Sequence, residues 1–238
     1  VSTIPTVHGE SIVMRVLDRE SIKLSLSVMG FSDHNLRRYS DLLARPHGVL
    51  LVTGPTGSGK TTTLYASLAS LDSESLKIIT VEDPVEYQLQ GVNQIQVQSQ
   101  IDLDFSRALR AILRQDPDII MIGEMRDTET AKIGVQSALT GHMVLSTLHT
   151  NTAASAITRL EDMGVERYLI TSSVNGVLAQ RLVRSLCEEC KEPVELDNAS
   201  IDQTGLRPYV TGKSCTVYQA VGCESCMKTG YSGRTGIH

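Results

Sequence analysis

Residues 48–61 read Gly-Val-Leu-Leu-Val-Thr-Gly-Pro-Thr-Gly-Ser-Gly-Lys-Thr, and this stretch decides the fold. Its first six residues are apolar enough to form a strand that is buried on both faces. The remaining eight, Gly54 to Thr61, match the phosphate-loop pattern GxxxxGK followed by Ser or Thr at every fixed position. Glycines in this pattern let backbone N–H groups converge on phosphate oxygens at the start of a helix. The stretch therefore predicts a strand, a loop that binds nucleotide phosphates, and a helix.

The phosphate loop supplies candidate ligands for ATP and for a magnesium ion. We expect Lys60 to neutralise the β and γ phosphate oxygens, and the Thr61 hydroxyl to bind Mg²⁺. The competing interpretation is an ordinary glycine-rich turn, which the flanking strand and helix disfavour. The candidate nucleotide-binding residues are Gly54, Pro55, Thr56, Gly57, Ser58, Gly59, Lys60, Thr61 and Thr62.

Apolar runs and helical periodicity alternate along the rest of the chain. Such alternation is typical of an α/β fold with a mostly parallel sheet, because helices return the chain between parallel strands. A helix is also expected between the Ser32 or Asp33 cap and Pro46. A strand is expected over 10–17 and a helix around 156–163. The alternating elements are a strand at 48–53, a helix at 62–71, a strand at 77–81, a helix at 104–115, a strand at 119–122, a helix at 128–139 and a strand at 143–147.

Polar side chains that suit catalysis follow three of these strands, at the sheet edge where ligands of open α/β sheets bind. Glu124 and Glu82 each stand at a strand end, and either one can polarise the attacking water. A solvated acid is the competing interpretation for both. His149 can donate to the γ-phosphate and report its loss, or it is only a satisfied polar residue.

Arginines complete the candidate catalytic set. Arg107, Arg110 and Arg114 fall at helical spacing on one face, and Arg15 lies on the first predicted strand. Any of them can approach a γ-phosphate as an arginine finger, although a solvated helix face is the more natural interpretation of Arg107. If the finger comes from a neighbouring subunit, hydrolysis requires an oligomer.

Four of the five cysteines form two CxxC pairs, Cys187 with Cys190 and Cys223 with Cys226. Two such pairs suit a tetrahedral Cys₄ zinc site, which is structural and not catalytic. Redox thiols or metal-free surface cysteines are the alternatives. Cys215 is the odd one and is expected to be free.

Composition limits the function classes. The chain has 22 Lys plus Arg against 27 Asp plus Glu, a net charge of −5, which argues against a general nucleic-acid coat. No run of residues is long and apolar enough for a membrane-spanning helix, so any membrane contact is expected to go through a partner. The first twenty residues do not resemble a signal peptide, and the cysteine usage fits a reducing cytoplasm.

Taken together, these motifs resemble the secretion ATPase superfamily, and finer matches at 63–66 and 176–184 favour its type II secretion branch. The resemblance covers nearly the whole chain. The matching segments, in family order, are Gly54 to Thr61 (Walker A), Thr80 to Glu86 (Asp box), Gly123 to Asp127 (Walker B), Thr140 to Asn151 (His box) and the two CxxC pairs.

The resemblance implies a RecA-like ATPase domain that works as a homo-hexamer. It further implies a cytoplasmic motor, peripheral to the inner membrane, that moves an inner-membrane platform and so assembles a pilus-like fibre for protein export. By position Glu82 falls in the Asp box, Glu124 in Walker B and His149 in the His box. Arg15 would close a preceding domain that packs against the nucleotide site.

Three alternatives stay open: a type IV pilus assembly ATPase, which shares every motif, a nucleic-acid translocase, and a scaffold that binds ATP without turnover. The acidic charge and the scarcity of aromatic residues disfavour the translocase, so no nucleic-acid partner is expected. The expected domains are 1–20, the end of a mostly absent preceding domain; 21–186, the ATPase domain; and 187–238, the zinc subdomain with the start of a truncated C-terminal part.

Overall fold

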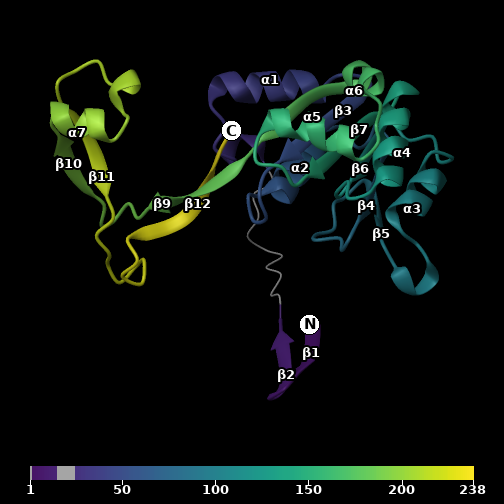
Figure 1. Cartoon of the computed structure of the whole chain (residues 1–238), viewed down its shortest axis with the longest axis horizontal. Coiled ribbons are helices and arrows are strands. Elements are labelled where there is room, and N and C mark those ends of the chain that lie inside the picture. The colour runs from purple at the N-terminus through teal and green to yellow at the C-terminus, as the bar shows by residue number, and fades with distance from the viewer. Residues whose placement is uncertain (1, 15–24) are drawn as a thin grey trace. The chain divides into compact units, whose positions relative to one another are not determined.

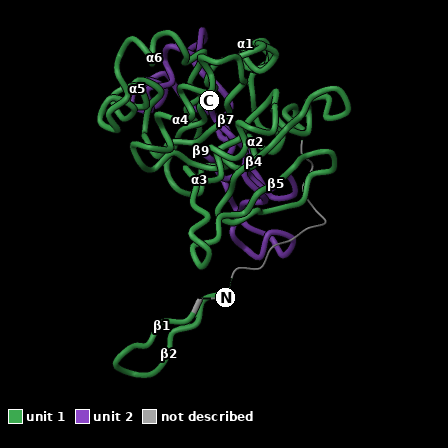
Figure 2. Tube along the Cα trace, turned by 90° about the vertical axis from the view of Figure 1, so that its right-hand side faces the viewer, with its two compact units in different colours: residues 1–180, 238 green, residues 181–237 purple. Residues whose placement is uncertain are grey.

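The computed structural model describes residues 2–14 and 25–238. It divides the chain into two compact units, residues 1–180 with His238 and residues 181–237 (Figure 2). The three domains predicted from the sequence remain predictions.

A six-stranded sheet forms the centre of the first unit (Figure 1). Its strands are ordered β5-β4-β6-β7-β3-β8, and every neighbouring pair is parallel. The predicted α/β fold with a mostly parallel sheet is therefore confirmed. The strands are β3 (Gly48–Thr53), β4 (Ile78–Glu82), β5 (Val92–Gln96), β6 (Ile119–Ile122), β7 (Met143–Leu148) and β8 (Val174–Ala179).

Helices cover both faces of this sheet, and its four central strands are accordingly buried along their whole length. In β3, Leu50 and Val52 pack into one core, while Val49 and Leu51 pack into the other, and all four are at most 1% exposed. Alternate side chains of a strand point to opposite faces, so both faces of β3 are buried. One face carries α1 (Asp33–Leu43) and α2 (Lys60–Ala69), and the other carries α3 (Phe105–Ile112), α4 (Thr128–Leu139), α5 (Ala153–Asp162) and α6 (Arg167–Ser173).

Side-chain caps start several of these helices. Ser32 accepts a hydrogen bond from Asn35 N at the start of α1, as the predicted cap requires. Asp104 caps α3 in the same way. However, α3 ends at Ile112 and not at the predicted position 115. Asp116 adopts a positive φ of 52° just before a proline, and the chain turns there towards β6 instead of continuing the helix.

Several short elements were not predicted. They include the edge strands β5 and β8, the helix α6, and two 3₁₀ turns at Leu26–Val28 and Ser99–Ile101. Near the N-terminus, β1 (Ser2–Thr6) pairs antiparallel with β2 (Gly9–Val13), which begins the strand predicted over 10–17. Residues 15–17 of that prediction and the polar segment that follows lie outside the described residues.

The second unit consists of two antiparallel strand pairs. In one pair β9 (Arg181–Leu186) lies beside β12 (Tyr231–Ile237), and in the other β10 (Glu192–Leu196) lies beside β11 (Cys215–Gln219). A short helix α7 (Asn198–Gln203) and a 3₁₀ turn at Arg207–Tyr209 connect β10 to β11. The two CxxC segments lie where the strand pairs meet, one between β9 and β10 and the other between β11 and β12.

Candidate functional site

A cleft of about 330 Å³ lies in the first unit, where β4, β6 and β7 end beside the phosphate loop that follows β3. The four segments are far apart in sequence, and the parallel sheet brings their carboxyl ends to one edge. Ligands bind at this edge in open α/β sheets. The residues that line the cleft include Thr56, Gly57, Lys60, Thr61, Glu82, Asp83, Glu86, Gly123, Glu124, Arg126, Thr147 and His149.

The phosphate loop has the backbone that its glycines allow. Gly54 has a φ of 151° and Gly59 a φ of 84°, both in the region that favours glycine. A Cβ on Gly54 would lie 2.3 Å from Gln180 O and 2.6 Å from Ser58 Oγ, so no larger residue fits there. Gly59 is also the cap residue of α2, whose first N–H groups open towards the loop.

Gln180 braces this loop from below. Its side-chain amide donates to Ser58 O at 2.9 Å and accepts from Thr63 Oγ1 at 2.7 Å, while its backbone N–H donates to Thr53 O at 2.8 Å. The side chain is only 3% exposed. Gln180 therefore joins the end of β3, the loop and the first turn of α2, a role that no sequence motif indicated.

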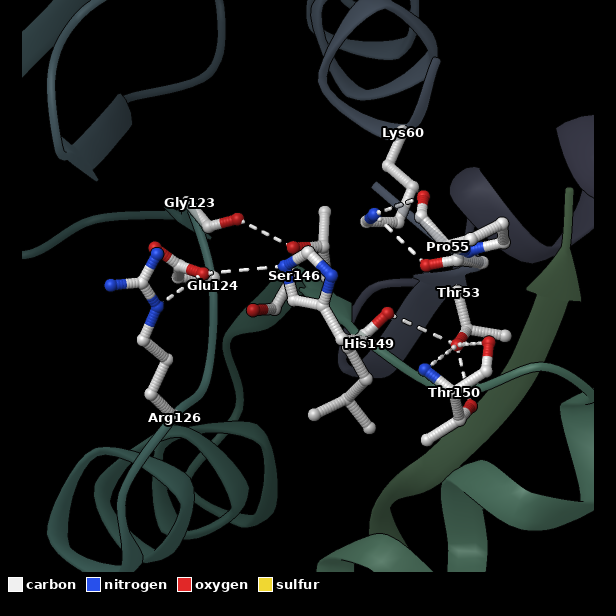
Figure 3. A network of polar contacts seen from close by, with 12 residues as sticks. Thr53, Pro55, Lys60, Gly123, Glu124, Arg126, Ser146, His149 and Thr150 are labelled. Carbon is white, nitrogen blue, oxygen red and sulfur yellow. Dashed lines mark hydrogen bonds and ion pairs between the residues drawn. The ribbon is translucent and has the colours of Figure 1, made fainter. Parts of the chain in front are cut away.

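Lys60 folds back over the loop. Its Nζ donates to Gly54 O and to Pro55 O, each at 3.0 Å (Figure 3). Burial lowers the pKa of Lys60, and the nearby carboxylate of Glu124 offsets part of that effect. In the same loop, Ser58 Oγ is buried and has no hydrogen-bond partner among the described residues.

Glu124 stands opposite Lys60, between two basic side chains (Figure 3). Its Oε2 lies 2.6 Å from Arg126 Nε and 3.5 Å from His149 Nε2. The side chain of Glu124 is 12% exposed, so the cleft shields it without sealing it. Arg126 was not singled out as a site residue, although its position two residues after Glu124 was the available signal.

Hydrogen bonds at the ends of β3 and β7 fix the segment that carries His149. Thr53 Oγ1 contacts Thr150 N at 3.1 Å and Leu148 O at 3.1 Å, and Thr147 Oγ1 donates to Gly123 O at 2.8 Å. The segment is therefore tied both to the phosphate strand and to the strand that leads to Glu124.

Glu82, the other predicted base, lines the same cleft in a different environment. It is 2% exposed, and its carboxylate receives hydrogen bonds from Tyr65, Thr80 and Gln94. The sequence left Glu82 and Glu124 as equal candidates, and the structure places one among neutral donors and the other between two basic groups.

The other candidate arginines do not line the cleft in the described part of the chain. Arg110 pairs with Glu129 on the surface, and Arg107 donates to the carbonyl oxygens of residues 101 and 102. Arg114 lies in the turn after α3 and not on the helix itself, because that helix ends early. Arg15 lies outside the described residues.

The four CxxC cysteines of the second unit converge in space. Their sulfur atoms all lie within 4.8 Å of one another. The separations of Cys223 from Cys226, Cys190 from Cys226 and Cys187 from Cys223 are 3.7, 3.8 and 3.9 Å. A tetrahedral ion with Zn–S bonds of about 2.3 Å holds its sulfur ligands about 3.8 Å apart, whereas a disulfide needs about 2.05 Å. The cluster therefore matches a metal site and not a pair of disulfides.

Backbone N–H groups donate to two of these sulfurs. Cys223 N and Gly230 N each lie 3.2 Å from Cys226 Sγ, and Gly222 N lies 3.3 Å from Cys190 Sγ. The donation from Cys223 N contributes most to lowering the pKa of Cys226 to about 6. Cys215 lies on β11 outside this group, as expected.

Among the described helices, none has both the length and the apolar character needed to cross a membrane.

Comparison with known proteins identifies the family. The family model described as "Type II/IV secretion system protein" matches residues 1–238. Type II secretion system protein E of Dickeya dadantii is 54% identical over 238 residues, and Type II secretion system ATPase E of Vibrio cholerae is 56% identical over 238 residues. Both comparisons cover 100% of this chain and 47% of the relative, so the chain spans about half the length of the curated relatives it matches.

Solved structures agree with this assignment. The pilus retraction motor PilT with bound ADP has a TM-score of 0.64 and 33% identity, over 84% of this chain and 53% of that chain. The Legionella pneumophila ATPase DotB has a TM-score of 0.58 and 29% identity, over 68% of this chain and 47% of that chain. The resemblance to secretion ATPases and the predicted RecA-like P-loop core are thus confirmed. The chain belongs to the type II/IV secretion system protein family.

Proposed function

We propose that this chain binds and hydrolyses ATP as part of a type II secretion motor. One observation carries the proposal: the phosphate-loop lysine Lys60, the acid Glu124 and the polar side chain of His149 line a single cleft although they come from different segments. Phosphoryl transfer needs a phosphate cradle, a positioned water and groups that meet the developing charge, and these residues are of the types that supply them.

The phosphate loop binds the nucleotide. Its amides and the first N–H groups of α2 face the triphosphate, and the Lys60 ammonium moves from the carbonyls of Gly54 and Pro55 to the β and γ oxygens. Ser58 Oγ, which lacks a partner among the described residues, supports a ligand at this loop.

The donor set at the cleft suits magnesium. Hydroxyl and carboxylate oxygens are the ligands that Mg²⁺ prefers, and Thr61 and Glu124 both line the cleft. Thr61 and Glu124 would be the residues that hold the ion. When bound, Mg²⁺ neutralises charge on the β and γ oxygens.

Glu124 is the better candidate for the group that orients the attacking water. Its carboxylate is partly exposed and faces the lysine across the cleft. Glu82 is buried, and neutral donors occupy both of its oxygens, so water has less access to it. His149, 3.5 Å from Glu124, is placed to respond when the γ-phosphate leaves.

The working assembly is a homo-hexamer, in which an arginine from the next subunit completes the site. Arg110 and Arg114 support this reading because both are exposed and neither is among the residues that line the cleft of their own chain. Arg15 is a third candidate on the sequence alone. A finger arginine supplied in trans contributes about 10³ to 10⁵ in rate.

The secretion branch fits better than the pilus alternative. The curated type II secretion relatives are 54% and 56% identical to this chain over its whole length. The motor would drive a pilus-like fibre through an inner-membrane platform, and it would be cytoplasmic and peripheral to that membrane through its partners. With a net charge of −5, the chain is poorly suited to tracking nucleic acid.

The cysteine cluster holds a structural zinc ion. The sulfur spacing and the N–H donors described above fit a closed Cys₄ site, with Cys187, Cys190, Cys223 and Cys226 as the ligands. Zinc supplies no catalytic step there. Its binding would join the two CxxC segments that lie between the strand pairs of the second unit, and would contribute to the order of that unit.

Measurement of ATP turnover by the intact protein tests the proposal. Lys60→Ala should lower turnover by at least about 100-fold. Lys77→Ala removes an exposed lysine away from the cleft and should leave turnover unchanged. Wild-type turnover by Lys60→Ala contradicts the phosphate-loop argument. ATP binding without turnover in the assembled protein supports the scaffold alternative, and strong stimulation by single-stranded DNA supports the translocase.

A further inference from the structure

A loop with two acidic residues, which we call the acidic loop (residues 83–89), forms one wall of the nucleotide cleft. It follows β4 and contributes Asp83 and Glu86 to the cleft lining. The loop contains no helix or strand, so ladder hydrogen bonds do not hold its backbone. Side chains from other elements hold it instead.

Three side chains bind the backbone of this loop. Tyr65 Oη accepts from Glu86 N at 3.2 Å. Gln94 accepts from Leu89 N at 2.7 Å and donates to Tyr87 O at 3.0 Å. Gln96 accepts from Val85 N at 3.3 Å. The two glutamines lie on the edge strand β5, whereas Tyr65 lies on α2, the helix that the phosphate loop begins.

Tyr65 contacts both the acidic loop and the carboxylate of Glu82. Its ring is fully buried, five residues after Lys60, and it packs edge-on against Tyr87 with ring centres 5.3 Å apart. Its hydroxyl donates a hydrogen bond to Glu82 and accepts one from the backbone N–H of Glu86. Burial, together with the neighbouring Glu82 carboxylate, raises the pKa of Tyr65, so the hydroxyl keeps the proton that it donates.

Glu82 accepts hydrogen bonds from several of the surrounding side chains. One carboxylate oxygen accepts hydrogen bonds from Thr80 Oγ1 at 2.5 Å and from Gln94 Nε2 at 3.1 Å. The other oxygen accepts a hydrogen bond from the Tyr65 hydroxyl. A buried carboxylate that is bound this way is stabilised where it stands, and moving it would leave several donors unsatisfied. Its bonds therefore tie α2, β4 and β5 together directly under the acidic loop.

We propose that Tyr65 is a positioning residue, which fixes the acidic loop to the helix that grips the phosphates and so keeps Asp83 and Glu86 in the cleft wall. The proposal deepens the proposed ATPase and rests on it for its catalytic meaning. Because Tyr65 and Lys60 share one short helix, a displacement of that helix would reach the acidic loop through the Tyr65 hydroxyl and through the contact between the Tyr65 and Tyr87 rings.

Two measurements on the intact protein test this role: site-resolved hydrogen exchange and ATP turnover. Tyr65→Phe keeps the ring and removes the hydroxyl, so the Glu86 amide should exchange about tenfold faster, as expected for one lost hydrogen bond. Tyr39→Phe is the matched control. Tyr39 is 3% exposed, and its hydroxyl bonds Ser67 on the same helix at 2.8 Å. That variant should leave exchange in residues 83–89 unchanged.

A second variant, Gln94→Met, tests how the acidic loop is held without relying on Tyr65→Phe alone. Gln94→Met should expose the Leu89 amide to faster exchange even if Tyr65→Phe folds poorly. In turnover, Tyr65→Phe should lower kcat about tenfold with nucleotide affinity within about threefold of wild type, because Lys60 and the phosphate loop are untouched. Tyr39→Phe should retain wild-type kcat.

The outcomes separate the two proposals. Unchanged exchange at both amides in the variants overturns the positioning role, whatever the turnover. Faster exchange with wild-type kcat also overturns it, because the loop would then be held for stability alone. A wild-type protein that hydrolyses no ATP as an assembled hexamer overturns the proposed function, while faster exchange at the two amides still supports Tyr65 and Gln94 as the residues that hold the loop.

Discussion

Arg126 and Glu124 form an ion pair through one carboxylate oxygen, with 2.6 Å between Nε and Oε2. His149 approaches the same oxygen at 3.5 Å. The pair is asymmetric in exposure, because the Arg126 side chain is 67% exposed and that of Glu124 only 12%. The arginine can therefore turn away into solvent, whereas the acid keeps its place in the cleft wall.

Removal of the Glu124 charge should separate binding from cleavage. Glu124→Gln keeps the shape of the side chain, so ATP affinity should stay close to wild type while cleavage slows about 100-fold or more. Equilibrium titration with a fluorescent ATP analogue and single-turnover cleavage measure the two effects. Lost binding would instead assign Glu124 a structural role. Glu161→Gln, at an ion pair whose residues do not line the cleft, should change neither quantity.

Arg126→Ala should affect turnover more than stability. Because the Arg126 side chain is 67% exposed, solvent screens the pair and its contribution to stability is at most about 1 kcal/mol, so thermal unfolding should shift little. The Glu124 carboxylate would lose one orienting contact, and turnover should fall about fivefold, which corresponds to about 1 kcal/mol. Arg167→Ala removes an ion pair with Glu161 at 2.7 Å and is the control. Equal effects of the two variants on turnover would contradict a role at the cleft.

Gln180→Met should destabilise the phosphate loop, because it removes the side-chain hydrogen bonds of Gln180. The methionine fills similar space, but Ser58 O and Thr63 Oγ1 lose buried partners, which costs about 1–3 kcal/mol. Chemical denaturation should report that loss, and ATP affinity should fall with it. Gln136→Met replaces an exposed glutamine on α4 and should be neutral in both measurements. Unchanged ATP affinity in Gln180→Met would show that the loop keeps its shape without the brace.

The cysteine cluster should hold one zinc ion per chain. Cys226→Ser should lose the metal, and Cys215→Ser should retain it, because Cys215 lies outside the cluster. Elemental analysis of the freshly purified intact protein measures both. Chelation should increase proteolysis within residues 181–237 and leave nucleotide binding by the first unit intact. Metal-free wild-type protein would reject the zinc assignment.

The sequence predicted the buried centre of the fold because its signals are local. β6 is a run of four buried apolar residues, and α4 begins after the Asp127 cap, so both were predicted with their observed bounds. The edge strand β5 contains Asn93, Gln94 and Gln96, which weaken any apolar pattern. Such a strand is defined by its pairing with β4, which no local pattern reveals.

The candidate site was predictable to the same extent. Lys60, Glu124 and His149 each follow an apolar strand, and the parallel sheet then brings them together. Gln180 contacts Ser58, 122 positions away, and that relation exists only in the folded chain. Arg110 and Arg114 were placed on one helix face by spacing alone, which fails once α3 ends between them.

Gln180, which supports the phosphate loop, also stands at the boundary between the two units. Gln180 is the last residue of the first unit before the chain passes into Arg181 and the cysteine-bearing unit. Its backbone amide donates to the last residue of β3, Thr53, and its side chain donates to Ser58 in the phosphate loop. Along the chain, a single peptide bond therefore joins the residue that braces the phosphate loop to Arg181, the first residue of β9.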